Sequence, residues 1–479
     1  MNSRGGWQRD LRRKRFAGAR LLPRAGQGAG PGDRSAGGAS PGRPLLPPDK
    51  YAIRRAGLAT LVALVWILSG GAEPGAAEEA PVFLAGSSVR EITPAPGSPM
   101  SGYGDRGKEP SRGIHDRIYS RCLVLELGDL RIALVSAEVL AITLELRAAI
   151  AARIRDLDLD LLLLAATHTH SGPGGYKKGW AVERFLMGDY SESLFGYLSG
   201  QIAAGVSEAV RERRPARVSC GKGSAPDLVR NRRHEGGATD AEAGFLRVED
   251  LGGRPIAVVF NFGAHPTVLD PRNLLTSGDY PGMTSELLEK DLGAPALFFA
   301  GTLGDQKPHF PGTREWEAET GEQFAEAEKM AVHLAGEVRR AMAGAESEAV
   351  LVLRAEERRV KLPRVDLRAR CFFYVFAPAV RCLFRGLFHE ETLFQAVRVN
   401  DLVLAAVPAE MSAALGMRLK EGNPAGVTLI ACLANDTLGY ALTPEDYRTG
   451  GYEACMSFYG RETGTFFLEQ SLGTVQQLW

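Results

Sequence analysis

The sequence has few cysteines, and none of them has a metal-binding spacing. Its 479 residues include six cysteines, at positions 122, 220, 371, 382, 432 and 455, without a CxxC pair. This pattern excludes the common cysteine-based zinc motifs. Several cysteines lie in apolar runs, such as "RVSC" and "LIACLAND", which indicates buried thiols. Cys371 and Cys382 flank an aromatic segment and could form a disulfide in an exported protein.

The N-terminal region lacks the run of about 20 apolar residues that a bilayer span needs. Its apolar stretch follows Arg54 and Arg55, extends from about Ala56 to Leu68, and is followed by small residues. This order is typical of a secretory signal. We therefore interpret residues 51–81 as a signal peptide or an uncleaved N-terminal anchor, with a chance apolar helix as the alternative. An exported protein is expected: periplasmic, secreted or membrane-anchored.

Basic residues are outnumbered by acidic residues outside the N-terminal tail. Residues 1–55 contain 13 Lys and Arg against three acidic residues, whereas the net charge of the whole chain is zero. The remainder is therefore acidic overall, which argues against a nucleic-acid partner. Residues 1–50 are rich in Gly, Pro and Arg and lack apolar periodicity, so we predict a disordered tail there.

From residue 82 onward the sequence shows neither an internal repeat nor a linker, and strand-like and helix-like segments alternate. This alternation predicts an α/β fold of mixed β-sheets layered with helices on the outer faces. We expect a single large catalytic domain at 82–479. Expected strands are 131–142, 159–167, 254–266, 295–305, 348–362, 394–408 and 426–436. Expected helices are 144–157, 283–292, 316–344, 411–421 and 464–478.

Four of the predicted strands end in unusual polar residues. The segments are "AATHTHSGPGGY", "VFNFGAHPTVLDP", "AAVPAEMS" and "LANDTLGYALTPEDY". Alternate side chains of an extended segment share a face, so His168 and His170 should point the same way. Two imidazoles at one place form half of a metal site, although both could instead be polar plugs bonded to the backbone. Together the four loops predict a His₂Glu-type zinc site with an open position for water, and spacing does not separate His168 from His170.

The same motifs, in the same order, resemble the neutral (alkaline, non-lysosomal) ceramidase family. The opening "AGSSVREITPAPGSPMSGYGDR" and "GIHDRIYSRCLVLE" are similar to that family as well, so the resemblance covers about residues 84–465. It implies a zinc-dependent amidase that cleaves the N-acyl bond of ceramide, giving sphingosine and a fatty acid. We expect the C-terminal β-sandwich domain of the family to be absent.

The resemblance also implies roles for individual residues. The Zn²⁺ ligands would be His168, His265, Glu410 and Tyr440. The catalytic residues would be His170, Arg232 in "VRNRRHE", and Tyr452 in "GGYEA". From the residues alone, Arg232 is read as a surface charge in a basic run and Tyr452 as ordinary core packing. Asp279 in "SGDYPG" is a candidate to orient His265.

One position departs from the family pattern. The family has a "GDVSP"-like turn with a catalytically important serine, but this chain reads "GDQKP", with Lys307 at the serine position. Without that hydroxyl we predict direct attack by metal-activated water rather than an acyl-enzyme, with His170 as the proton-transfer group.

Two alternatives stay open. The first keeps the metal but changes the substrate to another amide, an ester or a lactone, and the second is a non-catalytic, zinc-stabilised surface protein. The leading prediction implies a ceramide-like lipid as the small-molecule partner. The segment 370–390 mixes aromatic residues with arginines. It is interpreted either as a membrane-surface contact or as core packing.

Overall fold

The computed structural model describes residues 81–310, 320–368, 371 and 388–479. These residues belong to one compact unit, Glu79–Trp479. The predicted tail at 1–50, nearly all of the signal or anchor segment at 51–81, and most of the aromatic segment at 370–390 lie outside the described residues. Within the described ranges, none of the helices combines the length and apolarity needed to cross a bilayer.

The larger sheet has eight strands in the order β11-β9-β8-β6-β1-β3-β4-β5. Its edge pairs, β4 with β5 and β9 with β11, are parallel, and the pairs between them are antiparallel. The bounds are β1 Leu84–Glu91, β3 Tyr119–Leu127, β4 Leu130–Ala137, β5 Leu161–Ala166, β6 Arg214–Ser224, β8 Glu242–Asp250, β9 Pro255–Phe262 and β11 Ala296–Ala300.

This sheet bends sharply in its middle. Strands β1 and β6 share only two residue pairs, Leu84 with Pro215 and Ala85 with Arg214. The two halves can therefore fold toward each other, and the edge strand β11 contacts β3, β4 and β5 across the bend. The Ser136 hydroxyl of β4 donates a hydrogen bond of 2.6 Å to the Phe298 carbonyl of β11. Parallel strands from opposite ends of the sheet thus end near one another.

A second sheet of four strands has the order β13-β14-β15-β17. The pairs β13·β14 and β14·β15 are antiparallel, whereas β15·β17 is parallel. One apolar core contains side chains from both sheets, among them Leu163, Val259 and Leu404, so the sheets pack face to face. The bounds are β13 Leu353–Lys361, β14 Glu391–Val399, β15 Leu402–Ala406 and β17 Val427–Ala431.

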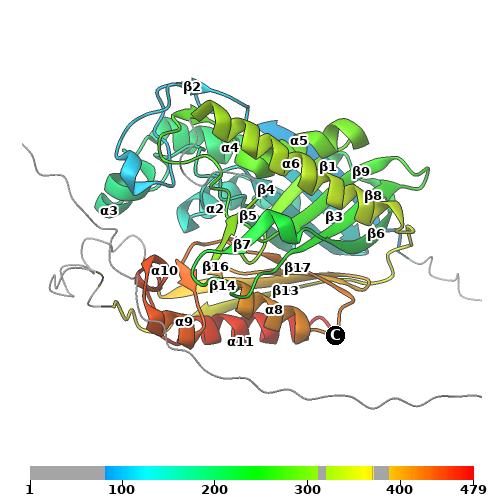
Figure 1. Ribbon diagram of the computed structural model, residues 1–479. Coiled ribbons are helices and arrows are strands. Elements are labelled where there is room, and N and C mark those ends of the chain that lie inside the picture. The colour runs from blue at the N-terminus through cyan, green and yellow to red at the C-terminus, as the bar shows by residue number, and fades with distance from the viewer. Residues whose placement is uncertain (1–80, 311–319, 369–370, 372–387) are drawn as a thin grey trace, which may run out of the picture. The chain divides into compact units, whose positions relative to one another are not determined.

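Helices cover the outer faces of these sheets (Figure 1). Helices α4, α5 and α6 lie on the larger sheet, and α8 and α11 lie on the smaller one. A further helix, α2, contacts α4. The bounds of the helices are α2 Leu144–Arg153, α4 Glu192–Arg211, α5 Asp279–Leu292, α6 Thr320–Ala343, α8 Ala413–Glu421 and α11 Thr463–Gln476. Short pieces complete the fold: α3 Trp180–Val182, α9 Pro444–Thr449, α10 Tyr452–Cys455, β2 Gly113–Ile114, β7 Val229–Asn231, β10 Leu275–Thr276, β12 Gln306–Pro308, β16 Glu410–Met411 and β18 Tyr440–Ala441.

The predicted fold class, an α/β arrangement of mixed sheets with outer helices, is confirmed. Several predicted boundaries are wrong. The expected strand at 131–142 ends at Ala137, because the chain turns there into a loop. The expected strand at 394–408 is a hairpin of β14 and β15, turned at Asn400, whose φ of 49° is typical of Asn in a tight turn. Helix α4, although amphipathic, was not among the predicted helices.

Candidate metal centre

The four predicted polar loops all follow the carboxyl ends of parallel-paired strands. Strand β5 leads to His168, β9 to His265, β15 to Glu410 and β17 to Tyr440. The Asn261 amide of β9 links this strand to β11 and to β17 of the smaller sheet, because it donates hydrogen bonds to the carbonyls of Phe299 (2.6 Å) and Ile430 (2.7 Å). The loops therefore emerge at one edge, where α/β proteins commonly place their sites.

His168 and His265 are both held through their Nδ1 atoms. Nδ1 of His168 lies 2.7 Å from the Leu140 carbonyl oxygen, and Nδ1 of His265 lies 2.6 Å from the Leu303 carbonyl oxygen. A carbonyl only accepts, so each Nδ1 carries the proton and each neutral ring presents its Nε2 lone pair. Both lone pairs are directed toward Glu410: its Oε2 is 3.6 Å from Nε2 of His168 and 3.1 Å from Nε2 of His265.

The two histidines of the HxH motif do converge, but a strand pleat is not the reason. Strand β5 ends at Ala166, before either histidine. His168 has a φ of 69°, which turns the chain back toward the sheet edge. The Nε2 atoms of His168 and His170 end up 3.2 Å apart. The expectation of an extended HxH segment was therefore wrong in its local geometry.

His170 completes a cluster of three imidazoles. The candidate ligand atoms of His168, His170 and His265 all lie within 4.8 Å of one another. Nδ1 of His170 is buried without a hydrogen-bond partner, and the Tyr103 ring lies 4.7 Å from its own ring, centroid to centroid. His168 and His265 have an Nδ1 held by a backbone carbonyl and an Nε2 near Glu410, whereas His170 has neither contact.

Glu410 and Tyr440 are fixed by a short parallel ladder between β16 and β18, in which they are direct partners. Both residues are buried. The Tyr440 hydroxyl accepts a hydrogen bond of 3.0 Å from Arg232, which also donates to the Gly304 carbonyl at 2.9 Å. An ion pair of 2.8 Å between Arg232 and Glu453 completes the contacts of this guanidinium. Arg232 is therefore part of the site rather than a surface charge.

Burial and neighbouring polar groups set the protonation of the candidate ligands. It lowers the pKa of His168, lowers that of His170 well below the usual value, and lowers that of His265 to about 4. Burial also opposes the charge of Glu410, but His168, His265 and Tyr440 outweigh it and hold the pKa of Glu410 at about 2. At neutral pH the site contains neutral imidazoles and an ionised carboxylate.

This donor set fits a divalent cation. Nε2 of His265 and Oε2 of Glu410 are both buried acceptors that lack a hydrogen-bond partner. Two acceptors 3.1 Å apart repel each other unless a cation or a proton lies between them. Nitrogen and carboxylate oxygen at one point are the ligands that Zn²⁺ prefers.

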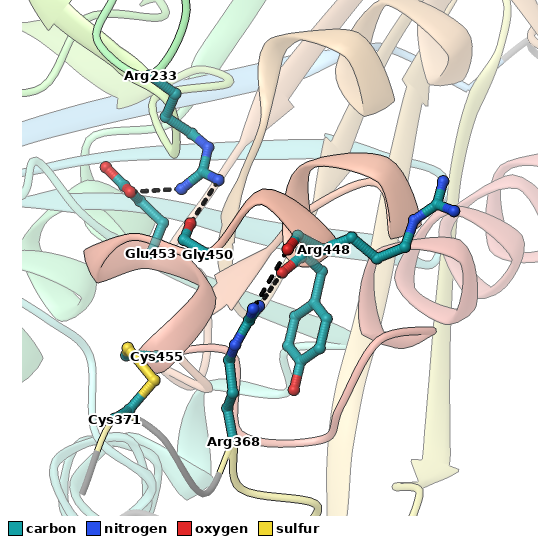
Figure 2. Close-up of a disulfide and its surroundings, with 8 residues drawn as sticks. Arg233, Arg368, Cys371, Arg448, Gly450, Glu453 and Cys455 are labelled. Atoms are coloured by element: carbon teal, nitrogen blue, oxygen red, sulfur yellow. Dashed lines mark hydrogen bonds and ion pairs between the residues drawn. A yellow bond between two sulfur atoms is a disulfide. The ribbon is translucent and has the colours of Figure 1, made fainter. Parts of the chain in front are cut away.

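Tyr452 lies on α10, and the chain around this helix is held by arginines and a disulfide (Figure 2). Arg233 binds the Glu453 carboxylate at 2.6 Å and the Gly450 carbonyl at 2.8 Å, while Arg368 donates to the carbonyls of Tyr447 and Arg448. The Tyr452 and Tyr440 ring centroids are 5.8 Å apart. Tyr452 is therefore at the site, and the core-packing interpretation was wrong.

The disulfide beside α10 joins Cys371 to Cys455. The suggested pairing of Cys371 with Cys382 was therefore wrong. Cys455 lies 84 residues away in sequence and is brought near only by the fold. The thiols of Cys122 and Cys432 are buried, as their apolar surroundings predicted.

A cavity of about 100 Å³ opens onto the proposed ligands. His168, His170, Glu410, Tyr440 and Tyr452 line it. Most of its remaining wall is apolar, formed by Leu140, Ala141, Ile142, Val182, Leu186, Met187, Met456 and Phe458. A reacting group at the ligands can therefore carry an apolar chain along this wall.

Two further expectations have different outcomes. Asp279 does not orient His265: its carboxylate accepts from the backbone nitrogens of Leu269 (3.1 Å) and Tyr280 (2.6 Å), and Leu303 holds the imidazole instead. Lys307 lies in β12, opposite Arg230 of β7, and is not among the residues that line the cavity.

Sequence reasoning also missed residues that line the cavity, above all His389, Asp436 and Lys177. His389 is paired with Asp436, 47 residues further along the chain, so neither residue belongs to a local motif. The alternation of strands and helices carries no signal of this pairing.

Comparison with known proteins agrees with this architecture. Residues 83–310 match the family model of neutral/alkaline non-lysosomal ceramidase, N-terminal, a range that includes His168, His170, Arg232 and His265. Neutral ceramidases of Drosophila pseudoobscura pseudoobscura and Drosophila melanogaster are each 30% identical over 84 residues. These alignments cover 16% of this chain and span 12% of the length of each relative.

Solved structures match over a larger part of the chain. The crystal structure of neutral ceramidase from Pseudomonas aeruginosa has a TM-score of 0.72 at 21% identity, and covers 84% of this chain and 75% of its own. A ceramidase complexed with C2 has a TM-score of 0.71 at 20% identity, with the same coverage. These two matches establish the shared fold. The resemblance predicted from the sequence motifs is therefore confirmed: residues 83–310 match the neutral/alkaline non-lysosomal ceramidase family model, and the chain shares the fold of a solved neutral ceramidase.

Proposed function

We propose that this chain is a zinc-dependent hydrolase that cleaves the N-acyl amide bond of ceramide or a related lipid amide. The observation that carries the proposal is the convergence of two locked imidazole nitrogens on the Glu410 carboxylate, at a cavity with apolar walls. A non-catalytic zinc site would be closed by its ligands, whereas this one adjoins a cavity, which supports catalysis.

His168, His265, Glu410 and Tyr440 would hold the ion. When bound, Zn²⁺ supplies Lewis acidity toward a water molecule and toward a carbonyl oxygen. Tyr440 is kept in place by Arg232, at 3.0 Å, and Glu410 by its ladder with Tyr440. The ligands therefore need little rearrangement to bind the ion, which favours tight binding.

The neighbouring side chains supply charge and proton transfer. Burial lowers the pKa of His170 well below the usual value, so its ring is neutral. Its Nε2 lies 3.2 Å from Nε2 of the proposed ligand His168, and we assign His170 the transfer of the proton from the attacking water to the leaving amine. Burial opposes the charge of Arg232, but Tyr440, Glu453 and Glu410 raise its pKa, and the guanidinium stays charged. Arg232 and the Tyr452 hydroxyl are the groups suited to stabilise negative charge on the carbonyl oxygen.

Lys307 replaces the serine of the family turn, so this route uses no acyl-enzyme. The same substitution favours a second candidate, in which the chain hydrolyses another amide, an ester or a lactone at the same site. An apolar-walled cavity of this kind accepts a lipid chain in either case.

We propose export as the location of this activity. Residues 51–81 support export, because basic residues are followed there by an apolar stretch and then by small residues, as in a secretory signal. The disulfide between Cys371 and Cys455 supports it as well, because disulfides persist in oxidising compartments. The proposed partner is a ceramide-like lipid. A membrane contact through 370–390 stays a prediction.

The test combines metal analysis with hydrolysis of short-chain N-acyl and O-acyl substrates. The purified protein should contain one zinc ion and release fatty acid from N-acylsphingosine. His168→Ala should lose both the zinc and the turnover. Zinc with turnover of esters alone would favour the second candidate, and zinc without any turnover would contradict the proposed function.

A further inference from the structure

A second group of polar side chains lines the cavity besides the proposed ligands and catalytic residues. It comprises His389, Asp436, Thr437 and Lys177, on a wall that is otherwise largely apolar. None of these residues takes part in the proposed metal chemistry. Polar groups placed singly in an apolar pocket commonly fix the orientation of a ligand and its specificity.

Asp436 serves to hold His389 rather than to bind a ligand. Its Oδ2 lies 2.9 Å from Nδ1 of His389 and accepts a hydrogen bond of 3.0 Å from the Thr392 hydroxyl. Its Oδ1 accepts from the backbone nitrogen of Thr437 at 2.8 Å. The Asp436 side chain is only 1% exposed, so these three donors from the chain itself satisfy the carboxylate.

His389 is fixed at its backbone as well as at its ring. The buried Tyr459 hydroxyl accepts from the backbone nitrogen of His389 and donates to its carbonyl, both at 3.2 Å. Because the carboxylate of Asp436 only accepts, Nδ1 of His389 carries a proton, and in the neutral tautomer of the ring Nε2 is therefore the acceptor. Within the described ranges, Nε2 has no hydrogen-bond partner, and the ring lines the cavity.

These contacts select the chemistry of the ligand. In the tautomer that donates from Nδ1 to Asp436, the Nε2 lone pair faces the cavity, so this ring matches a ligand that donates a hydrogen bond. An anion is disfavoured, since the Asp436 carboxylate lies behind the ring and the Lys177 ammonium is already bound by both oxygens of Glu145, at 2.9 and 3.0 Å. A fatty acyl chain has no donor, so the donor belongs to the amine half of a lipid amide.

We propose that His389, held by Asp436, is a specificity-determining residue that accepts a hydrogen bond from a hydroxyl group on the amine half of the substrate. This inference rests on the proposed amide hydrolysis and assigns a binding role to a residue outside the metal site. Asp436 and Thr437 lie on the loop that ends in Tyr440, and His389 lines the same cavity as the proposed ligands.

The test uses two amides with the same hexanoyl chain. One is the amide of an amino diol with an eight-carbon chain, and the other is the amide of the matching amine without hydroxyls. The natural protein should prefer the first in kcat/KM by about tenfold or more, because a site that hydrogen-bonds a hydroxyl discriminates against an analogue that lacks it. His389→Leu should remove this preference by lowering kcat/KM for the diol amide alone, and His389→Gln should restore part of it.

A matched control is His115→Leu. His115 is also paired with a carboxylate through Nδ1, at 2.8 Å from Asp116, but it does not line the cavity. The preference should stay unchanged in this variant. His389→Leu could fail to fold, because it leaves the buried Asp436 charge unpaired. The double variant His389→Leu/Asp436→Asn removes that charge, and it should lose the preference for the diol amide in the same way. If His389→Leu lowers kcat/KM equally for both amides, or changes neither value, the inference is overturned.

Binding of the two free amines, measured by calorimetry, separates this inference from the proposed function. If neither amide is hydrolysed but the amino diol binds, and binds about tenfold more weakly to His389→Leu, the hydrolase proposal fails and the hydroxyl subsite stands. If both amides are hydrolysed and the amino diol binds both proteins equally, the subsite is overturned and the hydrolase stands. If neither amide is hydrolysed and the amino diol does not bind, both are overturned.

Discussion

Glu410 and Tyr440 are direct partners in the parallel ladder between β16 and β18, so one backbone pairing positions both proposed oxygen ligands. The proposed nitrogen ligands are positioned by backbone carbonyls instead: Leu140 for His168 and Leu303 for His265. All four side chains are thus oriented before any ion binds. The affinity of the site for a cation should depend on charge and donor chemistry more than on folding.

Replacing Glu410 with Gln tests the charge of the site. The variant keeps the shape of the side chain but removes the anion, and its amide can donate to Nε2 of His265, only 3.1 Å from the carboxylate in the natural protein. We expect the affinity for zinc to fall by at least about 100-fold, as in the loss of an important metal-site contact. Competition with a chelator measures it. Glu445→Gln, an exposed site on α9, is the control and should bind zinc normally.

The pH dependence of zinc binding follows from the lowered pKa values. Zinc requires neutral imidazoles, and burial lowers the pKa of His265 to about 4 and also lowers that of His168. The form with neutral histidines, which binds zinc, therefore persists as the pH falls. It is lost only when the pH approaches the lowered pKa values of His168 and His265. We expect zinc to remain bound at about pH 5, where ordinary histidines of pKa about 6.5 would be protonated. Calorimetry at pH 6 in buffers of different ionisation enthalpy should show almost no proton release from the histidines, and release of about two protons from them would contradict this account.

Gly102 is a steric test of the position of His170. Gly102 has a φ of 107°, and a Cβ there would lie 2.6 Å from Cγ of His170. Gly102→Ala should displace the imidazole and reduce kcat by about 100-fold, a usual effect of losing a proton-transfer group. Gly97→Ala is the matched control, since Gly97 also has a positive φ, of 89°, but a Cβ there meets nothing within 4 Å. Gly97→Ala should lose about 1 kcal/mol of stability and keep its activity, whereas Gly102→Ala should lose more stability, because of the contact with His170, and should also lose activity.

The disulfide between Cys371 and Cys455 should stabilise the segment that carries Tyr452. It closes a sequence separation of 84 residues. Reduction, or the variant Cys455→Ser, should lower the free energy of unfolding by about 2–4 kcal/mol. Urea denaturation with and without a reductant measures this. A reductant should have no further effect on Cys455→Ser, and an effect of equal size on both proteins would point to another cause.

Lys307 should be dispensable for catalysis despite its position in the family turn. It lies in β12 and does not line the cavity. We expect Lys307→Ala to retain kcat/KM within about threefold, because a side chain that does not reach the reacting groups adds little to the stabilisation of the transition state. Mass spectrometry during turnover should detect no acylated enzyme. A trapped acyl group on any Ser or Lys would contradict direct attack by water.

The sequence predicted the parts of this protein that depend on local pattern. Strand ends rich in His and Glu located the four loops, since the carboxyl ends of neighbouring strands meet at one edge. The positive φ of His168 was not predictable, because that conformation is imposed by the hydrogen bond from its backbone nitrogen to the Val139 carbonyl and by neighbouring loops. The pairs Cys371–Cys455 and His389–Asp436 join residues 84 and 47 positions apart, so they depend on how elements distant in sequence pack against each other.

The most direct measurement is anomalous diffraction at the zinc absorption edge, on crystals of the full chain grown with the metal. Our account predicts a single strong peak between Nε2 of His168, Nε2 of His265, the Glu410 carboxylate and the Tyr440 hydroxyl, at about 2.0–2.2 Å from each. A peak bound by other donors, or no peak at this cavity although the crystals contain zinc, would contradict it.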